Sequence, residues 1–306
     1  MNSPSAVSHI APKLRRGAPL LPRCFWFIEP APGCDPGETA PFIETSPRAY
    51  KSSTGRWQIK RQGRVEKEYL FETVLSRRVL PFALLEKDLL FLPVVAMENG
   101  AMLLERAALV ARGTLYAAAF VKETEQIFGR RDRQKTLYET IDSDRALSIQ
   151  DPHRNVVLVF RPGLNSAAAL LVQSAGADGW AANGFIADHE TYYCYPETEE
   201  EGDYLCGVLN ALRAEKTTDL ADAKAPGVQN RLTGLVLNPD SIPAYNRANV
   251  EHTRLAALAH ECRIVGEKLV QSYRGKPKNV RQALTQAHKK QLSVMTQIVK
   301  SAILPS

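Results

Sequence analysis

The chain has 306 residues, of which 44% are hydrophobic and 24% charged, and its formal net charge is +6. This length and composition exclude wholesale disorder, and the longest apolar run, residues 89–97, is about half as long as a membrane helix requires. Five widely spaced cysteines and a polar, basic stretch over residues 1–18 argue against a disulfide framework, a zinc site and a secretion signal, so we expect a cytoplasmic protein with no membrane association and no metal.

Short strand patterns dominate the N-terminal part of the chain. Aromatic and β-branched residues gather at Arg23–Glu29, and the alternation at Arg56–Lys60 places Trp57 and Ile59 on one face of a second strand. Apolar runs flank Glu98-Asn-Gly100, which is a turn signal. The sequence therefore predicts a hairpin at this turn.

Helix and strand patterns alternate in the middle of the chain. The period lengthens from Leu115 to Phe128, which predicts a helix. Residues 155–161, 167–173 and 184–195 predict further strands, because they are rich in β-branched and other apolar side chains. After an acidic run, Tyr204 to Arg213 predicts a helix with Asn210 as a C-terminal cap.

The last 60 residues predict two helices. Apolar residues at spacings of 3, 4, 3 and 4 form one helix face: Leu255, Leu258, Cys262, Val265 and Leu269. Gly275 and Pro277 end this helix, and a second apolar face follows from Val280 to Val299. We expect the two helices to pack antiparallel, with Arg263, Arg274, Lys276, Lys278 and Arg281 facing outward.

These elements predict an α+β fold, in which a mixed, strand-rich domain is followed by a basic C-terminal antiparallel helical hairpin. The expected divisions are an α+β domain over residues 1–215, an irregular connection over 216–244 and the hairpin over 245–306. Residues 245–306 contain eleven Lys and Arg against three Glu, a net charge of +8, so the rest of the chain is slightly acidic. The basic surplus therefore lies mainly in the hairpin.

Two further clusters of basic residues are candidates for contacts with the phosphates of a polyanion, because Lys and Arg neutralise phosphate charge. No acidic residue precedes Glu29, and only Asp132 interrupts the second cluster. The candidates are Lys13, Arg15, Arg16 and Arg23 in the first cluster and Arg130, Arg131 and Lys135 in the second. Solvated helix faces and loops are the alternative for either cluster, and for Arg23 a structural ion pair is an equal alternative.

Motifs of catalysis are missing from the sequence. There is no Walker loop, no G-x-S-x-G elbow and no H-E-x-x-H helix. A methyltransferase needs a glycine-rich turn for its cofactor and an Asn-Pro-Pro-aromatic motif for the target nitrogen, and Asn238-Pro-Asp240 lacks the second proline and the aromatic residue. We therefore expect a chain that binds no cofactor and is not catalytic by itself.

Several short blocks of sequence follow one another between residues 12 and 270. They are Lys13–Ile28, Leu80–Phe82, Leu92–Val94, Gly184–Asp188 with Tyr192-Tyr193, Asp203–Asn210, and Ile242–Asn246 with His252, Leu255–Leu258 and His260–Cys262. In this order they resemble the C-terminal target-recognition region of N6-adenine DNA methyltransferases from restriction-modification and phage-defence systems. The chain departs from that family between Arg213 and Asn238, where only Gln229-Asn-Arg231 is similar to the family's pattern.

The resemblance implies a DNA-binding specificity subunit, or a detached recognition domain, that works with a methyltransferase or nuclease partner. Double-stranded DNA is then the expected ligand, and S-adenosylmethionine, if used, is bound by the partner. Asn230 and Arg231 become candidates for base contacts, because Asn pairs with adenine and Arg with guanine. The docking surface for the partner is expected on Leu255, Leu258, Val265 and Leu269, and the alternative is that Leu255–Leu269 bury against the rest of the chain. The alternative is an interaction scaffold of a defence complex that does not read DNA sequence.

Overall fold

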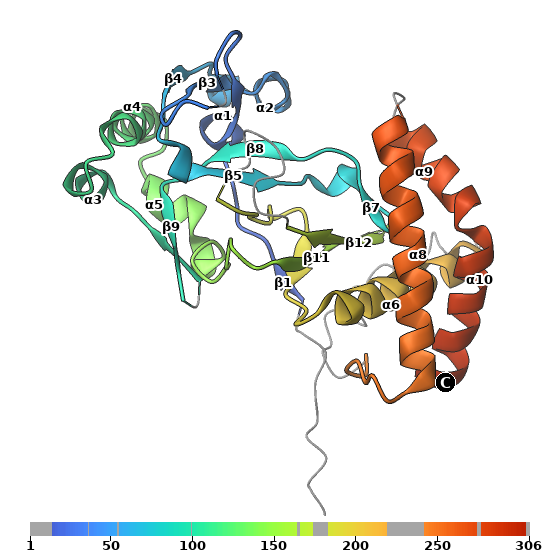
Figure 1. Cartoon of the computed structure of the whole chain (residues 1–306). Coiled ribbons are helices and arrows are strands. Elements are labelled where there is room, and N and C mark those ends of the chain that lie inside the picture. Colours follow the sequence, from blue (N-terminus) through green and yellow to red (C-terminus); the bar gives the residue numbers. More distant parts are fainter. Residues whose placement is uncertain are drawn as a thin grey trace, which may run out of the picture.

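The structure is a computed structural model that describes residues 14–35, 37–53, 55–98, 100–163, 166–173, 183–218, 242–273 and 277–303. It has the predicted α+β fold, with antiparallel sheets in the N-terminal two thirds and long helices after them (Figure 1). None of the helices in these ranges combines the length and the apolar character of a membrane span.

The first sheet is antiparallel and has the strand order β4-β3-β2-β8-β5. Its strands are β2 (Phe27–Pro30), β3 (Phe42–Thr45), β4 (Gln62–Arg64), β5 (Leu70–Thr73) and β8 (Asp88–Phe91). Helix α4 (Leu115–Arg131) packs against this sheet, and the rings of Phe120 and Phe91 meet edge to face at 4.9 Å. Burial of these aromatic rings supplies much of the first core.

Two predicted strands in this part of the chain are partly wrong. The segment from Arg23 begins as helix α1 (Arg23–Trp26) and becomes strand only at β2. The Arg56–Lys60 segment contains a 3₁₀ turn, Gly55–Trp57, in place of a strand. Trp57 and Ile59 nevertheless pack on the same core, as the alternation predicted.

Shorter elements connect the two sheets. The predicted hairpin at Gly100 is confirmed as β9 (Val94–Met97) paired with β10 (Gly100–Leu103). A second hairpin joins β6 (Val79–Leu80) to β7 (Ala83–Leu84). The short helices in the same part of the chain are α2 (Pro47–Ser52), α3 (Arg106–Ala111) and α5 (Leu137–Ile141).

The second sheet is antiparallel and has the order β1-β13-β11-β12. Its strands are β1 (Arg15–Arg16), β11 (Val156–Arg161), β12 (Ala167–Val172) and β13 (Tyr192–Cys194). Alternate residues of β11 point to opposite faces, so that Leu158 and Phe160 join one core cluster while Val157 and Val159 join another. Because both faces are covered, this strand is apolar from Val156 to Phe160.

The C-terminal helices are α6 (Glu199–Thr218), α8 (Val250–Ser272), α9 (Pro277–Ala287) and α10 (Lys289–Ile298). The second predicted apolar face is buried at Val280, Leu284, Met295 and Val299, although His288 divides its helix into α9 and α10. Helices α8 and α10 share one core with α6, β11 and β12, whereas α9 packs on the β6–β7 hairpin (Figure 1). The expected connection over 216–244 lies almost entirely outside the described residues, and the helices on its two sides pack together.

Asn210 was predicted to be a helix cap, but it is a buried residue within α6. Its side-chain oxygen accepts a hydrogen bond from the Ala168 amide at 3.1 Å, and its amide nitrogen donates to the Ala168 carbonyl at 2.9 Å. A buried backbone group without a partner costs about 1–3 kcal/mol, and Asn210 supplies partners to Ala168 on the edge of β12 that has no neighbouring strand. Asn210 therefore fixes α6 against the second sheet.

Candidate nucleic-acid interface

Arg15 and Arg16 lie on β1, at the edge of the second sheet. Both side chains are exposed, and the two residues pair with Tyr193 and Tyr192 of β13. Arg16 donates a hydrogen bond from Nε to the carbonyl oxygen of His189 at 2.9 Å. Lys13 lies outside the described residues. The structure thus leaves two of the predicted cations available to a phosphate.

Arg23 is committed to an ion pair inside the protein. Its Nη2 atom lies 2.6 Å from Glu190 and 3.4 Å from Asp188, and only 15% of its side chain is exposed. Burial raises the pKa of Glu190, but hydrogen bonds from Arg23 and Ser76 and the positive charge of Arg23 together bring it below its usual value. Arg23 therefore forms the structural ion pair that was the alternative to a phosphate contact, and we remove it from the candidate phosphate contacts.

Asp188, His189 and Glu190 are the residues on this edge that could approach a metal ion, because their ligand atoms lie within 4.8 Å of one another. The guanidinium of Arg23 already contacts both carboxylates. A cation at this position would be repelled by Arg23, so the geometry favours a structural ion pair over a metal centre.

The second predicted cluster lies at the C-terminal end of α4. Arg130 is exposed, Arg131 is half-buried, and the carbonyl of Arg131 accepts a hydrogen bond from Arg56. Lys135 is also exposed, but it lines a depression of about 430 Å³ together with Glu105 and Glu125. Glu105 and Glu125 thus offset the positive charge of Lys135. At the end of α4, by contrast, Arg56 adds a further positive charge to the arginines.

The segment between Glu44 and Glu66 supplies cations that the sequence analysis missed. It contains six Lys and Arg and no acidic residue, which is the signal that could have identified it. Four of the six have a carboxylate partner elsewhere in the chain: Arg48 with Glu86, Arg56 with Asp132, Arg61 with Glu123 and Arg64 with Glu38. Lys51 and Lys60 are exposed and have no ion-pair partner among the described residues, and Arg56 remains exposed at 3.9 Å from Asp132.

Aromatic contacts join this segment to the end of α4. The ring of Trp57 stacks on Phe128 at 5.6 Å, and the guanidinium of Arg56 lies 5.1 Å from the Trp57 ring. Lys60 lies 5.2 Å from the ring of Tyr50. We define the basic face as the cations of these two segments, Lys51, Arg56, Lys60, Arg130, Arg131 and Arg133, which are joined where Arg56 and Trp57 contact Arg131 and Phe128.

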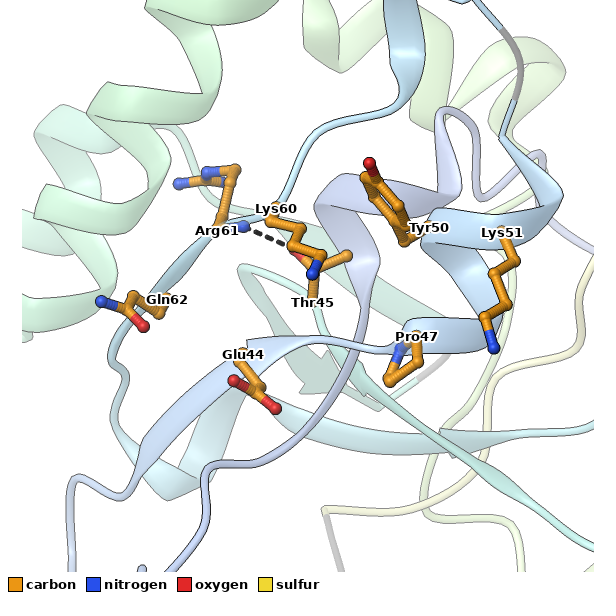
Figure 2. Close-up of a pocket in the computed structure, with 8 residues that line it drawn as sticks. All are labelled: Glu44, Thr45, Pro47, Tyr50, Lys51, Lys60, Arg61 and Gln62. Atoms are coloured by element: carbon orange, nitrogen blue, oxygen red, sulfur yellow. Dashed lines mark hydrogen bonds between the residues drawn. The ribbon is translucent and has the colours of Figure 1, made fainter.

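A shallow depression of about 400 Å³ lies on the basic face (Figure 2). Eight residues line it: Glu44, Thr45, Pro47, Tyr50, Lys51, Lys60, Arg61 and Gln62. The guanidinium of Arg61 points away from it, toward α4, where it contacts Thr124 and the Phe120 carbonyl. Two lysines against one glutamate leave the depression positive, which suits an anionic ligand.

The predicted base contacts, Asn230 and Arg231, lie outside the described residues. The core cysteines Cys24 and Cys262 are not suited to act as nucleophiles. Burial raises the pKa of Cys24 to about 11 and that of Cys262 to about 12. Both groups are therefore thiols at neutral pH and poor nucleophiles.

Most of the predicted docking surface is turned inward. Leu255 is fully buried against α6, and Leu258 and Leu269 are partly buried against the protein's own cores. Only Val265 is substantially exposed, at 42%. The apolar face predicted for a partner thus packs on the rest of the chain, because α6 supplies a matching apolar face that the sequence did not identify as its neighbour.

Arg263 was predicted to face outward, and this is wrong, because it is buried in the α6–α8 interface. It forms two bonds to Asp203 at 2.9 and 3.0 Å, and it contacts Glu199 at 2.9 Å. His260 completes the group through Nδ1, at 3.0 Å from Asp203. Hydrogen bonds and the negative charges of Asp203 and Glu199 raise the pKa of Arg263 above its usual value, although burial acts in the opposite direction.

No protein-family model matches this chain, and a search of curated proteins finds no similar sequence.

Proposed function

We propose that the chain is a DNA-binding target-recognition subunit of a restriction-modification or phage-defence system and that it acts in the cytoplasm. It binds double-stranded DNA electrostatically and is not catalytic by itself. The chemistry belongs to a methyltransferase or nuclease partner, which also binds S-adenosylmethionine where that cofactor is used.

One observation carries the proposal. An acid-free segment of the chain places Arg56 against the arginine-bearing end of α4 and exposes Lys51 and Lys60 at a neighbouring depression. Cations collected in this way match the regular negative charge of a DNA backbone. The half-buried rings of Tyr50 and Trp57 hold two of these cations near the surface, which lowers the entropic cost of ordering them.

The experiment is a titration of duplex DNA at several salt concentrations. Replacing Lys51, Arg56 and Lys60 together by Ala is expected to reduce the slope of log affinity against log salt by about 2.7, because each neutralised phosphate contributes about 0.9. Lys289 and Lys290 on α10 are equally exposed, and their replacement by Ala is the matched control with an unchanged slope. An unchanged slope in the triple variant would contradict DNA binding by the basic face.

The N-terminal arginines allow a second, independent measurement. Replacing Arg15 and Arg16 by Ala is expected to reduce the same slope by about 1.8 if both contact phosphates. Unchanged affinity at low salt removes β1 from the interface and leaves the basic face as the site. Because β1 belongs to the second sheet and the basic face lies on helices and loops beside the first sheet, the two variants report on different parts of the surface.

A further inference from the structure

Three arginines from separate elements gather where the C-terminal helices meet the second sheet. Arg161 is the last residue of β11, Arg213 belongs to α6, and Arg281 belongs to α9. All three are half-buried, and the Nε atoms of Arg213 and Arg281 are buried without a hydrogen-bond partner among the described residues. We call these three residues the arginine cluster.

The second sheet and α6 bring the first two of these arginines together. Arg161 pairs with Ala167 across the β11–β12 ladder. The next residue, Ala168, holds Asn210 of α6 through two hydrogen bonds. Arg213 follows Asn210 by three residues and so lies on the same face of α6.

The β6–β7 hairpin brings α9 to the same place. The amide of Phe82 donates to the Ala168 carbonyl at 2.9 Å, and its ring meets His288 edge to face at 5.4 Å. Leu284 of α9 packs with Leu80 and Ala83 of this hairpin. Arg281, Leu284 and His288 follow the spacing of one helix face, so the inward side of α9 carries a cation toward the second sheet.

Other buried arginines in the described part of the chain are treated differently. Arg23, Arg61, Arg78 and Arg263 each contact a carboxylate of this protein at 3.0 Å or less. None of the ion pairs among the described residues involves the arginine cluster. The buried arginines that stabilise the fold therefore each have a carboxylate partner within the protein, whereas the arginine cluster has none among the described residues.

The three guanidiniums also repel one another. Burial lowers the pKa of each, and a second lowering comes from a neighbour: from Arg281 on Arg161, from Arg161 on Arg213 and from Arg213 on Arg281. Glu190 acts on Arg161 in the opposite direction, but its carboxylate is already held by Arg23 and Ser76. The cluster lacks a nearby anion that could balance it among the described residues.

We propose that the arginine cluster is a binding site for a phosphate group. Three guanidiniums from three elements can offer paired N–H donors to several oxygens of one tetrahedral anion, which is the arrangement that arginine forms best with phosphate. The phosphate belongs either to a free phosphorylated small molecule or to a nucleic-acid backbone. The site is separate from the basic face, because α9 and α4 lie on opposite sides of the molecule (Figure 1).

Thermal unfolding of the full chain tests the proposal with inorganic phosphate as the probe and chloride at equal ionic strength as the reference. Phosphate is expected to raise the Tm by on the order of 3 °C more than chloride does, because it binds the folded state alone. The double variant Arg213→Gln with Arg281→Gln is expected to lose this difference. Without phosphate its Tm is expected to equal or exceed that of the parent, because two repelling charges are gone.

The matched control replaces Arg247 and Arg254, two exposed arginines of the same C-terminal part, by Gln and is expected to keep the phosphate effect. Equal phosphate effects in the parent and the double variant would overturn the proposal, as would a phosphate-free Tm of the double variant well below that of the parent. Calorimetric titration of phosphate into the folded variants repeats the comparison at constant temperature.

A third arm distinguishes the two sources of the phosphate. If the group belongs to a nucleic acid, the double variant also loses about 0.9 to 1 in the salt slope of duplex binding. If it belongs to a small molecule, the slope stays the same while the response to inorganic phosphate disappears. This result does not depend on the basic face, whose own variants retain the arginine cluster.

Discussion

Helix α6 touches two regions that use the same residue types in opposite ways. At its N-terminal half, Asp203 meets Arg263 and His260 of α8, and each of these three groups has a partner within about 3 Å. At its C-terminal half, Arg213 joins the arginine cluster, and His288 lies nearby on the α9–α10 junction with a buried Nε2 atom that has no partner among the described residues.

This difference separates stabilising charges from charges that await a ligand. A buried ion pair that satisfies its hydrogen bonds holds two helices in one arrangement, and removing one partner leaves the other charge buried and uncompensated. Unpaired cations at a similar depth destabilise the free protein, and they become favourable only when an anion binds. The α6–α8 ion pair therefore stabilises the fold, whereas the arginine cluster is suited to bind an anion.

The largest expected effect lies at the α6–α8 interface. Replacing Arg263 by Ala leaves Asp203 buried without its main partner, so we expect the free energy of unfolding to fall by about 3–5 kcal/mol. Denaturant unfolding of the full chain measures this change. Replacing Arg254, which is exposed and only 3.8 Å from Glu251, by Ala is the control, with an expected cost below about 0.5 kcal/mol. A loss below about 1 kcal/mol for Arg263→Ala would remove the contrast between the two regions.

A smaller effect is expected from His288 when the pH falls. Burial lowers the pKa of His288 to about 4, from 6.5 in the unfolded chain, so the folded state favours the neutral ring. The stabilisation is complete above pH 6.5 and is lost as the pH falls toward 4, by about 2 kcal/mol at pH 5. Unfolding measured at pH 7 and pH 5 tests this loss.

The variant His288→Met identifies the residue responsible. It is expected to lose most of the pH dependence between pH 7 and pH 5, because Met fills the space beside Phe82 without titrating. His252, whose pKa is also lowered by burial, contributes in the same direction. Full retention of the dependence in the variant would show that another group takes up the proton.

The smallest effect is expected on the outer side of α8. Val265 is 42% exposed and belongs to neither region, so replacing it by Ser is expected to change the free energy of unfolding by no more than about 0.5 kcal/mol. Leu255→Ala on the inner side is the comparison, with an expected cost of about 2–5 kcal/mol. Similar losses for both would mean that α8 is not oriented as described.

The elements that local patterns define could be predicted from the sequence. The turn at Gly100 gave the β9–β10 hairpin, and the spacing from Leu255 to Leu269 gave α8 with its break before Pro277. The partners of those elements could not be predicted, because they come from distant segments. Asp203 neutralises Arg263 from 60 residues away, which turned a predicted surface cation into a buried one.

The same reason explains the outcome for the candidate sites. Arg23 meets Glu190 across 167 residues, so that local charge counting could not distinguish it from Arg15 and Arg16. The basic face was within reach, because the acid-free segment between Glu44 and Glu66 is visible in the sequence. The arginine cluster was not, since its members are far apart along the chain and are joined only by the packing of α6 on the second sheet and of α9 on the adjoining β6–β7 hairpin.

Selection from a pool of random DNA duplexes is the most direct test of target recognition. The full chain is incubated with the pool at moderate salt, alone and with an excess of non-specific polyanion, and the bound duplexes are sequenced. We expect a short common sequence to be enriched in the presence of the competitor, and to be lost when Lys51, Arg56 and Lys60 are replaced by Ala. Binding that the competitor abolishes, with no sequence enriched, would contradict a recognition subunit.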